Sequence, residues 1–167
     1  MGQVQFEGFD LFTHYAQLRN RIGVVPQDDV IHRQLTVRKA LSYAAELRFP
    51  PDVPAAVRER RVDETLAGLQ LVARADTLVA RLSGGQRKRT SVAMELLTEP
   101  SLLFLDEPTS GLDPGLDKMV ISTLRTLADG GRTVMVITHS VANLSVCDNV
   151  LVLGPGGKVA YFGPPDK

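Results

Sequence analysis

Two adjacent carboxylates close a short apolar stretch in the second half of the chain. Residues 102–105 read LLFL, and Asp106 and Glu107 follow directly. A continuous apolar run of this length predicts a buried strand of a parallel sheet, and α/β folds bind their ligands at the carboxyl ends of such strands. There, one carboxylate can hold a hard divalent cation while its neighbour orients and deprotonates a water molecule. An acidic turn without function would not explain why two carboxylates crowd together, so we favour the functional interpretation of Asp106 and Glu107.

A helix start follows these carboxylates within the same segment. Asp113 is of a residue type preferred at the N-cap, and Pro114 suits the first helical position. Local structure therefore explains both residues, and the pattern alone gives Asp113 no chemical role.

A second candidate site lies in the string LSGGQRKR at residues 82–89. Ser83 and Gln86 have the spacing of a capping box, which alone predicts a well-formed helix start. A capping box does not explain Gly84 and Gly85, because a glycine inside a helix costs up to about 1 kcal/mol relative to alanine. Glycine instead lets backbone N–H groups approach an anion closely at the positive end of the helix dipole. The serine and the two glycines are therefore candidates for phosphate contact.

Three cations, Arg87, Lys88 and Arg89, follow near the start of the same helix. Positive charge is disfavoured near a helix N-terminus unless an anion lies close by. Taken individually, each of these side chains is expected to belong to a solvated face.

Several apolar or alternating segments predict the strands that would position these residues. A half-buried strand is expected at the start of the chain, and a hairpin with a glycine-rich turn is expected at its end. The predicted strands are Gln3–Gly8, Arg21–Gln27, Leu102–Asp106 and Thr133–Thr138, and those of the hairpin are Val150–Leu153 and Val159–Phe162.

The middle of the chain changes to the spacing of helices. Thr36 is expected to cap a helix that ends before Pro50, and Asp52 is expected to cap a second helix. The first of these helices carries apolar residues at helical spacing, namely Val37, Ala40, Leu41, Ala44 and Leu47.

Two further helices are predicted, one from near Ser83 to before Pro100 and one from about Pro114 to Ala128. The second of them connects two apolar strands, and a strand, a crossover helix and a strand predict a parallel sheet. We therefore expect an α/β fold whose sheet is covered on both faces, with the helical block inserted into it.

Composition narrows the possible partners. The 19 basic and 19 acidic side chains balance, so no net field attracts nucleic acid or an anionic membrane surface, and no nucleic-acid partner is expected. Cys147 is the single cysteine, and no signal peptide is recognisable, which favours a reducing cytosolic setting. The apolar runs are far shorter than the roughly 20 residues that span a bilayer, so this segment itself is expected to be soluble.

In their order along the chain, these motifs resemble those of the nucleotide-binding domain of ABC transporters. The resemblance covers essentially the whole chain. LSGGQ matches the family's signature motif, LLFLDE is similar to its Walker B strand, and SGLD at residues 110–113 is similar to its D-loop. His139 after VMVIT resembles the switch histidine, and Gln27 after VVP resembles the Q-loop glutamine. Five ordered motifs rarely coincide by chance. The strings VPQDD, DEPTSGLD and VAYFGPP look most like the G-type, or white/pigment-precursor, group of exporters.

This resemblance implies a P-loop NTPase (RecA-like) core, an inserted α-helical subdomain and a small β-hairpin region, with ATP and Mg²⁺ as ligands. It assigns Glu107 as the catalytic base and places His139 and Gln27 at the γ-phosphate and the attacking water. Asp106, through water, and Gln27 would hold Mg²⁺. In a head-to-tail dimer, the nucleotide held by the other protomer would be met by Ser83, Gly84, Gly85 and Gln86, and Asp113 would lie across the interface.

The 167 residues depart from the family pattern at the phosphate-binding loop. The family has GxxxxGK followed by Ser or Thr, whose backbone N–H groups and lysine cradle the phosphates. Here the only Gly-Lys pair, Gly157 and Lys158, is followed by valine. We therefore expect one partial domain, truncated before Met1 and inactive alone. Residues 1–30 and 99–167 would be pieces of the α/β core, and residues 31–98 would be the helical signature subdomain.

Three functions remain compatible with the sequence. The first is the ATP-hydrolysing motor of an ABC exporter at the cytoplasmic face of the cell membrane, partnered by a second such domain, as a homodimer, and by a transmembrane domain. The second is a non-transport ABC ATPase of the DNA-repair or translation type. Repair members resemble half-domains separated by a long coiled coil, and the short helices here disfavour that arrangement. The third is a catalytically silent ABC-like interaction module.

Overall fold

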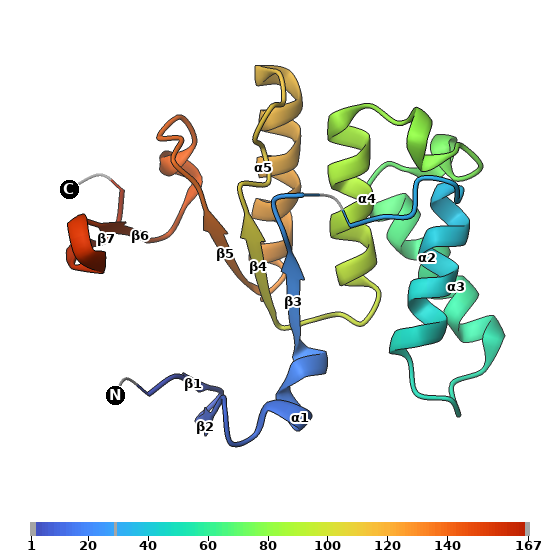
Figure 1. Ribbon diagram of the computed structural model, residues 1–167, viewed down its shortest axis with the longest axis horizontal. Helices are drawn as coiled ribbons and strands as arrows, with labels where there is room; N and C mark the ends of the chain where they lie inside the picture. The colour runs from blue at the N-terminus through green and yellow to red at the C-terminus, as the bar shows by residue number, and fades with distance from the viewer. Residues whose placement is uncertain (1–2, 29, 166–167) are drawn as a thin grey trace.

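The computed structural model describes residues 3–28 and 30–165, and Figure 1 shows their course. No helix in these ranges is both long and apolar enough to cross a membrane. The elements in chain order are β1 (Gln5–Phe6), β2 (Phe9–Asp10), α1 (Tyr15–Leu18), β3 (Ile22–Val25), α2 (Val37–Arg48), α3 (Ala55–Gly68), α4 (Gly84–Leu96), β4 (Leu102–Asp106), α5 (Pro114–Asp129), β5 (Thr133–Ile137), β6 (Val150–Leu153) and β7 (Val159–Gly163).

A parallel three-stranded sheet in the order β3-β4-β5 forms the centre of the molecule. Val25 pairs with Leu105, and Asp106 pairs with Ile137, so the three strands end almost level with one another. The predicted strands at these positions are confirmed, and so is the α/β class with a parallel sheet. The apolar runs form strands here because their branched and aromatic side chains suit a pleated, half-buried surface.

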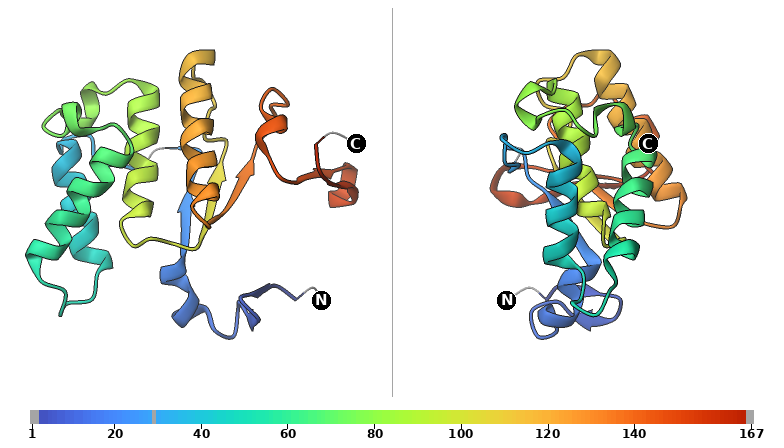
Figure 2. Two further views of the ribbon diagram at one scale, coloured as in Figure 1. Left: turned by 180° about the vertical axis from the view of Figure 1, so that it is seen from behind. Right: turned by 90° about the vertical axis from the view of Figure 1, so that its right-hand side faces the viewer.

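Helices cover only one face of this sheet in the described part of the chain, so the expectation of cover on both faces is wrong. Val25, Leu103 and Leu105 are fully buried on the face toward α4 and α5, whereas Val24 and Met135 on the opposite face are about half exposed. Figure 2 shows both helices on the same side. The reason is topological: the steps from β3 to β4 and from β4 to β5 run in the same direction, and right-handed crossovers then place their helices on one side.

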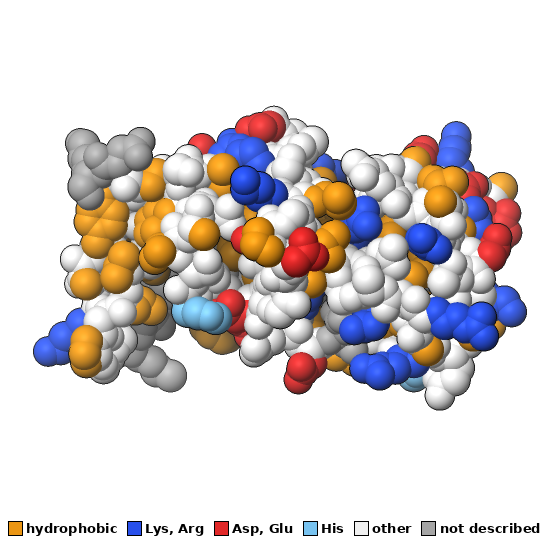
Figure 3. All heavy atoms as spheres, turned by 90° about the horizontal axis from the view of Figure 1, so that it is seen from above, with side chains coloured by type: hydrophobic (Ala, Val, Ile, Leu, Met, Phe, Trp, Pro, Cys, Tyr) orange, Lys and Arg blue, Asp and Glu red, His pale blue; other side chains and the backbone are white. Residues whose placement is uncertain are grey.

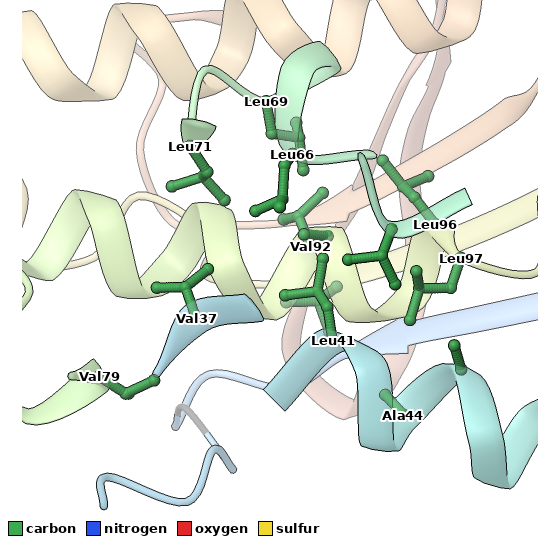
Figure 4. Close-up of a cluster of buried hydrophobic side chains, with 14 of the residues drawn as sticks. Val37, Leu41, Ala44, Leu66, Leu69, Leu71, Val79, Val92, Leu96 and Leu97 are labelled. Atoms are coloured by element: carbon green, nitrogen blue, oxygen red, sulfur yellow. The ribbon is translucent and has the colours of Figure 1, made fainter. Parts of the chain in front are cut away.

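The helices α2, α3 and α4 enclose an apolar cluster beside the sheet. Leu41, Leu66 and Val92 come from these three helices and lie together, almost completely buried (Figure 4). Thr36 caps α2 as predicted, because its hydroxyl accepts a hydrogen bond of 3.3 Å from the N–H of Lys39. The side chains in this cluster fix the start of α4 relative to the sheet.

Two details of the predicted helices are wrong. Asp52 does not cap α3, whose N-cap is Pro54, because the chain makes a turn in which the N–H of Val53 bonds to the carbonyl of Pro50. Leu47 is exposed although it follows the helical spacing of its neighbours. At 100° per residue it lies about 90° from the centre of the buried stripe of α2.

The expected first strand is also shorter than predicted. Only Gln5 and Phe6 form β1, which pairs antiparallel with β2. Glu7 and Gly8 both have positive φ, at 52° and 81°, as the two central residues of a type I′ hairpin turn do. This turn ends the strand after two residues. The predicted C-terminal hairpin is confirmed, since β6 and β7 pair antiparallel with Gly156 and Gly157 in their turn.

One end of the molecule collects the elements that carry the candidate site. The carboxyl ends of β3, β4 and β5 lie at the top of Figure 1, and the N-terminal ends of α4 and α5 lie there too. Figure 3 looks down on this end and shows many basic side chains over its helical part, on the right. An anionic ligand at the strand ends would therefore lie beside both helix N-termini.

Candidate functional site

Each of the three parallel strands places predicted site residues at or just beyond its last pair. Gln27 follows β3, Asp106 and Glu107 come at the end of β4, and His139 follows β5. The nearly level ends of the strands bring these residues to the same edge of the sheet. The residues assigned to the metal, the water and the γ-phosphate therefore occupy adjacent loops.

Glu107 has an unusual backbone conformation at this edge. Its φ is 45°, which lies in the left-handed region that residues other than glycine seldom adopt. Its N–H still donates to the carbonyl of Ile137 at 2.9 Å, which extends the pairing of β4 and β5 by one residue. The strained residue is thus held by the end of the neighbouring strand. Strain that the surroundings stabilise in this way is typical of functional positions.

Three groups of the loop after β5 hold the Glu107 carboxylate. Its Oε1 accepts from the backbone N–H of His139 at 3.0 Å and contacts the ring Nδ1 of His139 at 2.7 Å. Its Oε2 accepts from the hydroxyl of Thr138 at 3.3 Å. The Glu107 side chain is only 16% exposed, so these contacts fix it in one orientation.

This environment lowers the pKa of Glu107 and determines which ring nitrogen of His139 faces it. The hydrogen bond from the His139 ring is the main cause that lowers the pKa of Glu107, with further lowering by the charge of the ring, the His139 N–H and the Thr138 hydroxyl, and partial burial opposes it. The carboxylate therefore stays ionised near neutral pH. An ionised carboxylate only accepts hydrogen bonds, so Nδ1 must carry a proton, which leaves Nε2 for other partners.

Asp106 and Gln27 provide oxygen atoms on neighbouring strand ends. Among the residues that the structure describes, neither side chain makes a hydrogen bond or an ion pair, and no group of three or more His, Cys, Asp or Glu side chains could hold a metal. Mg²⁺ commonly binds through one or two protein oxygens, keeping water and substrate phosphates as its other ligands. The donor set therefore suits a magnesium ion that arrives with a nucleotide better than a resident metal.

The string at residues 83–86 forms the capping box that its spacing predicts. The N–H of Gln86 donates to Ser83 Oγ at 3.3 Å, and the Gln86 side chain accepts from the N–H of Ser83 at 3.1 Å. Gly85 also has a packing reason, because a Cβ there would lie 3.1 Å from Leu116 of α5. The signature glycine thus permits the start of α4 to touch the start of α5, whether or not it also contacts a phosphate.

Arg87, Lys88 and Arg89 do not form a solvated face, so that expectation is wrong. Their side chains donate to backbone carbonyls: Arg87 to Leu82 at 2.7 Å, Lys88 to Pro26 and Gln27 at 3.1 and 2.9 Å, and Arg89 to Leu69 at 3.2 Å. Lys88 is only 6% exposed. These cations hold the segments around α4 in place, which is a structural reason for their position near a helix N-terminus.

Asp113 has the structural role that its residue type predicts. Its Oδ1 accepts from the N–H groups of Gly115 and Leu116 at 3.0 and 3.2 Å, with Pro114 at the first position of α5. The capping bonds need no partner molecule. A further role of Asp113 across a dimer interface stays a prediction.

The sequence does not predict the roles of two residues, one at the site and one elsewhere on α4. Thr138 is predicted only as the end of a strand, although its hydroxyl holds Glu107. No sequence pattern indicates that the carboxylate of Glu95 accepts from the N–H of Val24 on β3 at 3.2 Å and pairs with Arg48. The only sequence signal was for Thr138, a hydroxyl residue directly before His139.

Comparisons with known proteins agree on one family. The family model described as "ABC transporter" matches residues 1–110. The chain is 61% identical to the ABC transporter ATP-binding/permease protein Rv1747 of Mycobacterium tuberculosis over 166 residues, which are 99% of this chain and 19% of that protein. It is 39% identical to ABC transporter G family member 28 of Arabidopsis thaliana, over 87% of this chain and 14% of that protein. With the broad substrate specificity ATP-binding cassette transporter ABCG2 of Bos taurus, it shares 37% identity over 91% of this chain and 24% of that protein.

A solved structure agrees with these relatives. The structure of cbiO1 from Clostridium perfringens, part of the ABC transporter complex cbiONQ, superimposes with a TM-score of 0.89 at 30% identity, over 99% of this chain and 66% of that one. The chain spans between 14% and 24% of the length of these three curated relatives.

Proposed function

Because the chain belongs to the ABC transporter family, with relatives in its G group, we propose that it is part of the ATP-hydrolysing motor domain of an exporter. The observation that supports this proposal best is the Glu107 carboxylate, which is ionised and held by Thr138 and His139 at the end of β4. A carboxylate fixed at the carboxyl edge of a parallel sheet is suited to orient a water molecule against a phosphate.

In the proposed reaction, the water oxygen bonds to the γ-phosphorus of ATP, and the bond from that phosphorus to the oxygen bridging to the β-phosphate breaks. Glu107 accepts a proton from the water, and the products are ADP and inorganic phosphate. Nε2 of His139 would contact the γ-phosphate, because Nδ1 is already engaged by Glu107. Gln27 would contact the same phosphate or the attacking water. The rate gain would come mainly from positioning and from charge stabilisation.

Asp106, through water, and Gln27 are the residues that would hold Mg²⁺. When bound, the ion neutralises developing charge on the phosphate oxygens. Its proposed ligands stand on neighbouring strand ends, next to Glu107.

We also propose a head-to-tail dimer driven by ATP, in which Ser83, Gly84, Gly85 and Gln86 approach the nucleotide of the partner. The start of α4 offers unpaired N–H groups and the positive end of a helix dipole, which suit the γ-phosphate. Asp113 would lie across the same interface. The proposed setting is the cytoplasmic face of the cell membrane, with a transmembrane domain as the second partner.

Phosphate binding needs more than these groups. The GxxxxGK[ST] loop is absent from the 167 residues, so we propose that this polypeptide alone does not turn over ATP. The alternatives are a non-transport ABC ATPase and a silent interaction module, and neither has a specific contact here in its favour.

The test is Glu107→Gln in a longer ABC protein in which this chain is joined to a GxxxxGK[ST] loop. Glutamine keeps the size and polarity of the side chain but cannot accept the proton, so ATP binding should persist while turnover falls by about two orders of magnitude or more. ATP-bound dimer should accumulate, as measured by size and by nucleotide content. Steady-state ATPase rates equal to those of the unchanged protein would remove Glu107 from the role of base.

A further inference from the structure

One stripe of α4 runs along the outer edge of β3. Lys88, Val92 and Glu95 are spaced by four and three residues, so they lie on one face of the helix. Glu95 accepts a hydrogen bond of 3.2 Å from the N–H of Val24. Since β3 is an edge strand of the parallel sheet, the Glu95 side chain satisfies a backbone N–H that a further strand would otherwise pair with.

Lys88 makes the second contact of this stripe, and it lies directly at the proposed glutamine. Its Nζ donates to the carbonyl of Pro26 at 3.1 Å and to the carbonyl of Gln27 at 2.9 Å. Lys88 is almost completely buried, and a buried charge is stable only if it is well hydrogen-bonded. Bonds from an ionised donor are about twice as strong as neutral ones, so these two bonds fix the two peptide units that flank the Cα of Gln27.

The same helix begins at the other proposed phosphate contact. Ser83 caps α4, and Lys88 follows only five residues later, little more than one helical turn. The capping box and the packing of Gly85 against Leu116 hold this turn as a rigid piece. A shift of the helix start would therefore move the lysine ammonium, and the two carbonyls would have to follow it or lose their bonds.

We propose that Lys88 is a positioning residue for Gln27: it ties the backbone of the glutamine to the helix that starts with the signature residues, so that both move together. This inference rests on the proposed function, because it concerns the glutamine assigned to the γ-phosphate. Lys88 itself touches neither nucleotide nor water in this role. It fixes the backbone from which the Gln27 side chain extends. Within the described residues, that side chain makes no hydrogen bond.

The first test measures the backbone of Gln27 in the 167-residue chain. Lys88→Met keeps the aliphatic stem and removes the donors. By ¹⁵N relaxation, the order parameter of the Gln27 amide should fall from the rigid range, about 0.85, toward the flexible range below about 0.6. The matched control is Arg89→Met, which removes a cation of the same helix that donates to Leu69 instead. The control should leave the Gln27 amide unchanged, because a purely structural loss does not act at that site.

Equal order parameters for Gln27 in Lys88→Met and in the unchanged chain would overturn the proposal. So would a loss of order at Gln27 in Arg89→Met as large as that in Lys88→Met. If Lys88→Met does not fold, as judged by circular dichroism, Lys88→Gln takes its place, because its shorter amide cannot hold both carbonyls at once. The same comparison of Gln27 amides then decides the outcome.

The second test is a double-mutant cycle of ATPase rates in the longer protein. Lys88→Met should lower kcat by about tenfold to a hundredfold with little change in KM, as misplacement of a catalytic group does. Gln27→Ala combined with Lys88→Met should be no slower than Gln27→Ala alone, because Lys88 acts through Gln27. Independent, multiplying effects would refute the link. A protein without ATPase activity would instead contradict the proposed function, and the relaxation test would still decide the role of Lys88.

Discussion

Two arginines of the same helix allow two contributions to the free energy of unfolding to be compared, that of a partly buried ion pair and that of an exposed ion pair. On α2, Arg48 pairs with Glu95, with side chains 35% and 16% exposed, whereas Arg38 pairs with Asp63 at 2.6 Å, with side chains 43% and 60% exposed. Arg48 also donates to the carbonyl of Met94 at 2.9 Å. Methionine at either position keeps the aliphatic stem and removes the charge and the donors.

The expected losses differ because the partners differ in exposure. Arg48→Met leaves the Glu95 carboxylate with only the Val24 N–H among the contacts described above, and it also removes the bond to Met94. Hydrogen bonds to charged groups contribute roughly 1.5–3 kcal/mol each, and partial solvation of the pair reduces this, so we expect a loss of about 2 kcal/mol. Arg38→Met removes a surface pair, for which about 0–1 kcal/mol is typical.

The assay is thermal and urea unfolding of the 167-residue chain, followed by circular dichroism. For a domain of this size, 1 kcal/mol shifts Tm by roughly 2–4 °C, so Arg48→Met should lower Tm by about 4–8 °C and Arg38→Met by no more than about 4 °C. Equal shifts in the two variants would refute the argument that burial decides the difference. A larger shift for Arg38→Met would refute it more strongly.

Three further predictions concern the site. His139→Ala should raise the pKa of Glu107 toward its ordinary value, since it removes the ring contact that is the main cause of the lowering; NMR titration of the Glu107 carboxyl carbon checks this, and an unchanged pKa would contradict the assignment. The pKa of Glu107 is lower in the folded state than in the unfolded state, so the stability linked to its ionisation is complete above the unfolded pKa and is lost as pH falls through the folded pKa. The His139→Ala variant should therefore lose less stability than the unchanged chain in that acid range. Ser83→Arg should abolish hydrolysis by the dimer of the longer protein while leaving ATP affinity of one protomer nearly unchanged, and a collapse of that affinity in equilibrium binding would show that Ser83 contacts the nucleotide of its own protomer. The 167-residue chain alone should show no tight Mg-ATP binding by titration calorimetry, and micromolar binding would contradict this. It should also self-associate through the half-exposed face of its sheet, as measured by light scattering, and a monomeric mass at all concentrations would contradict that expectation.

The sheet and its acidic end could be predicted because the information is contiguous in the chain. Leu102–Asp106 is one apolar run closed by carboxylates, and its buried pattern in a parallel sheet follows from that run alone. The capping residues Thr36, Ser83 and Asp113 were predictable for the same reason, since each cap bonds to an N–H within three residues.

Contacts between distant segments could not be predicted. Lys88 meets Gln27 across 61 positions, and nothing near either residue signals the other. The burial of Lys88 depends on where β3 lies against α4, which only the packed structure determines. Likewise, the turn at Pro50 moves the start of α3 to Ala55, although the sequence offers Asp52 as a good cap.

The left-handed backbone of Glu107 has a consequence for how this position changes over evolutionary time. A residue of this type in that conformation costs of order 1–3 kcal/mol, which glycine or asparagine would largely avoid. If only folding were under selection, glutamate at this position would therefore be replaced by glycine or asparagine. The domain would then be more stable but catalytically silent. In the proposed enzyme, the carboxylate persists only where activity is under continuous selection. A lineage released from that pressure should lose the glutamate early, before the apolar strand that carries it begins to change.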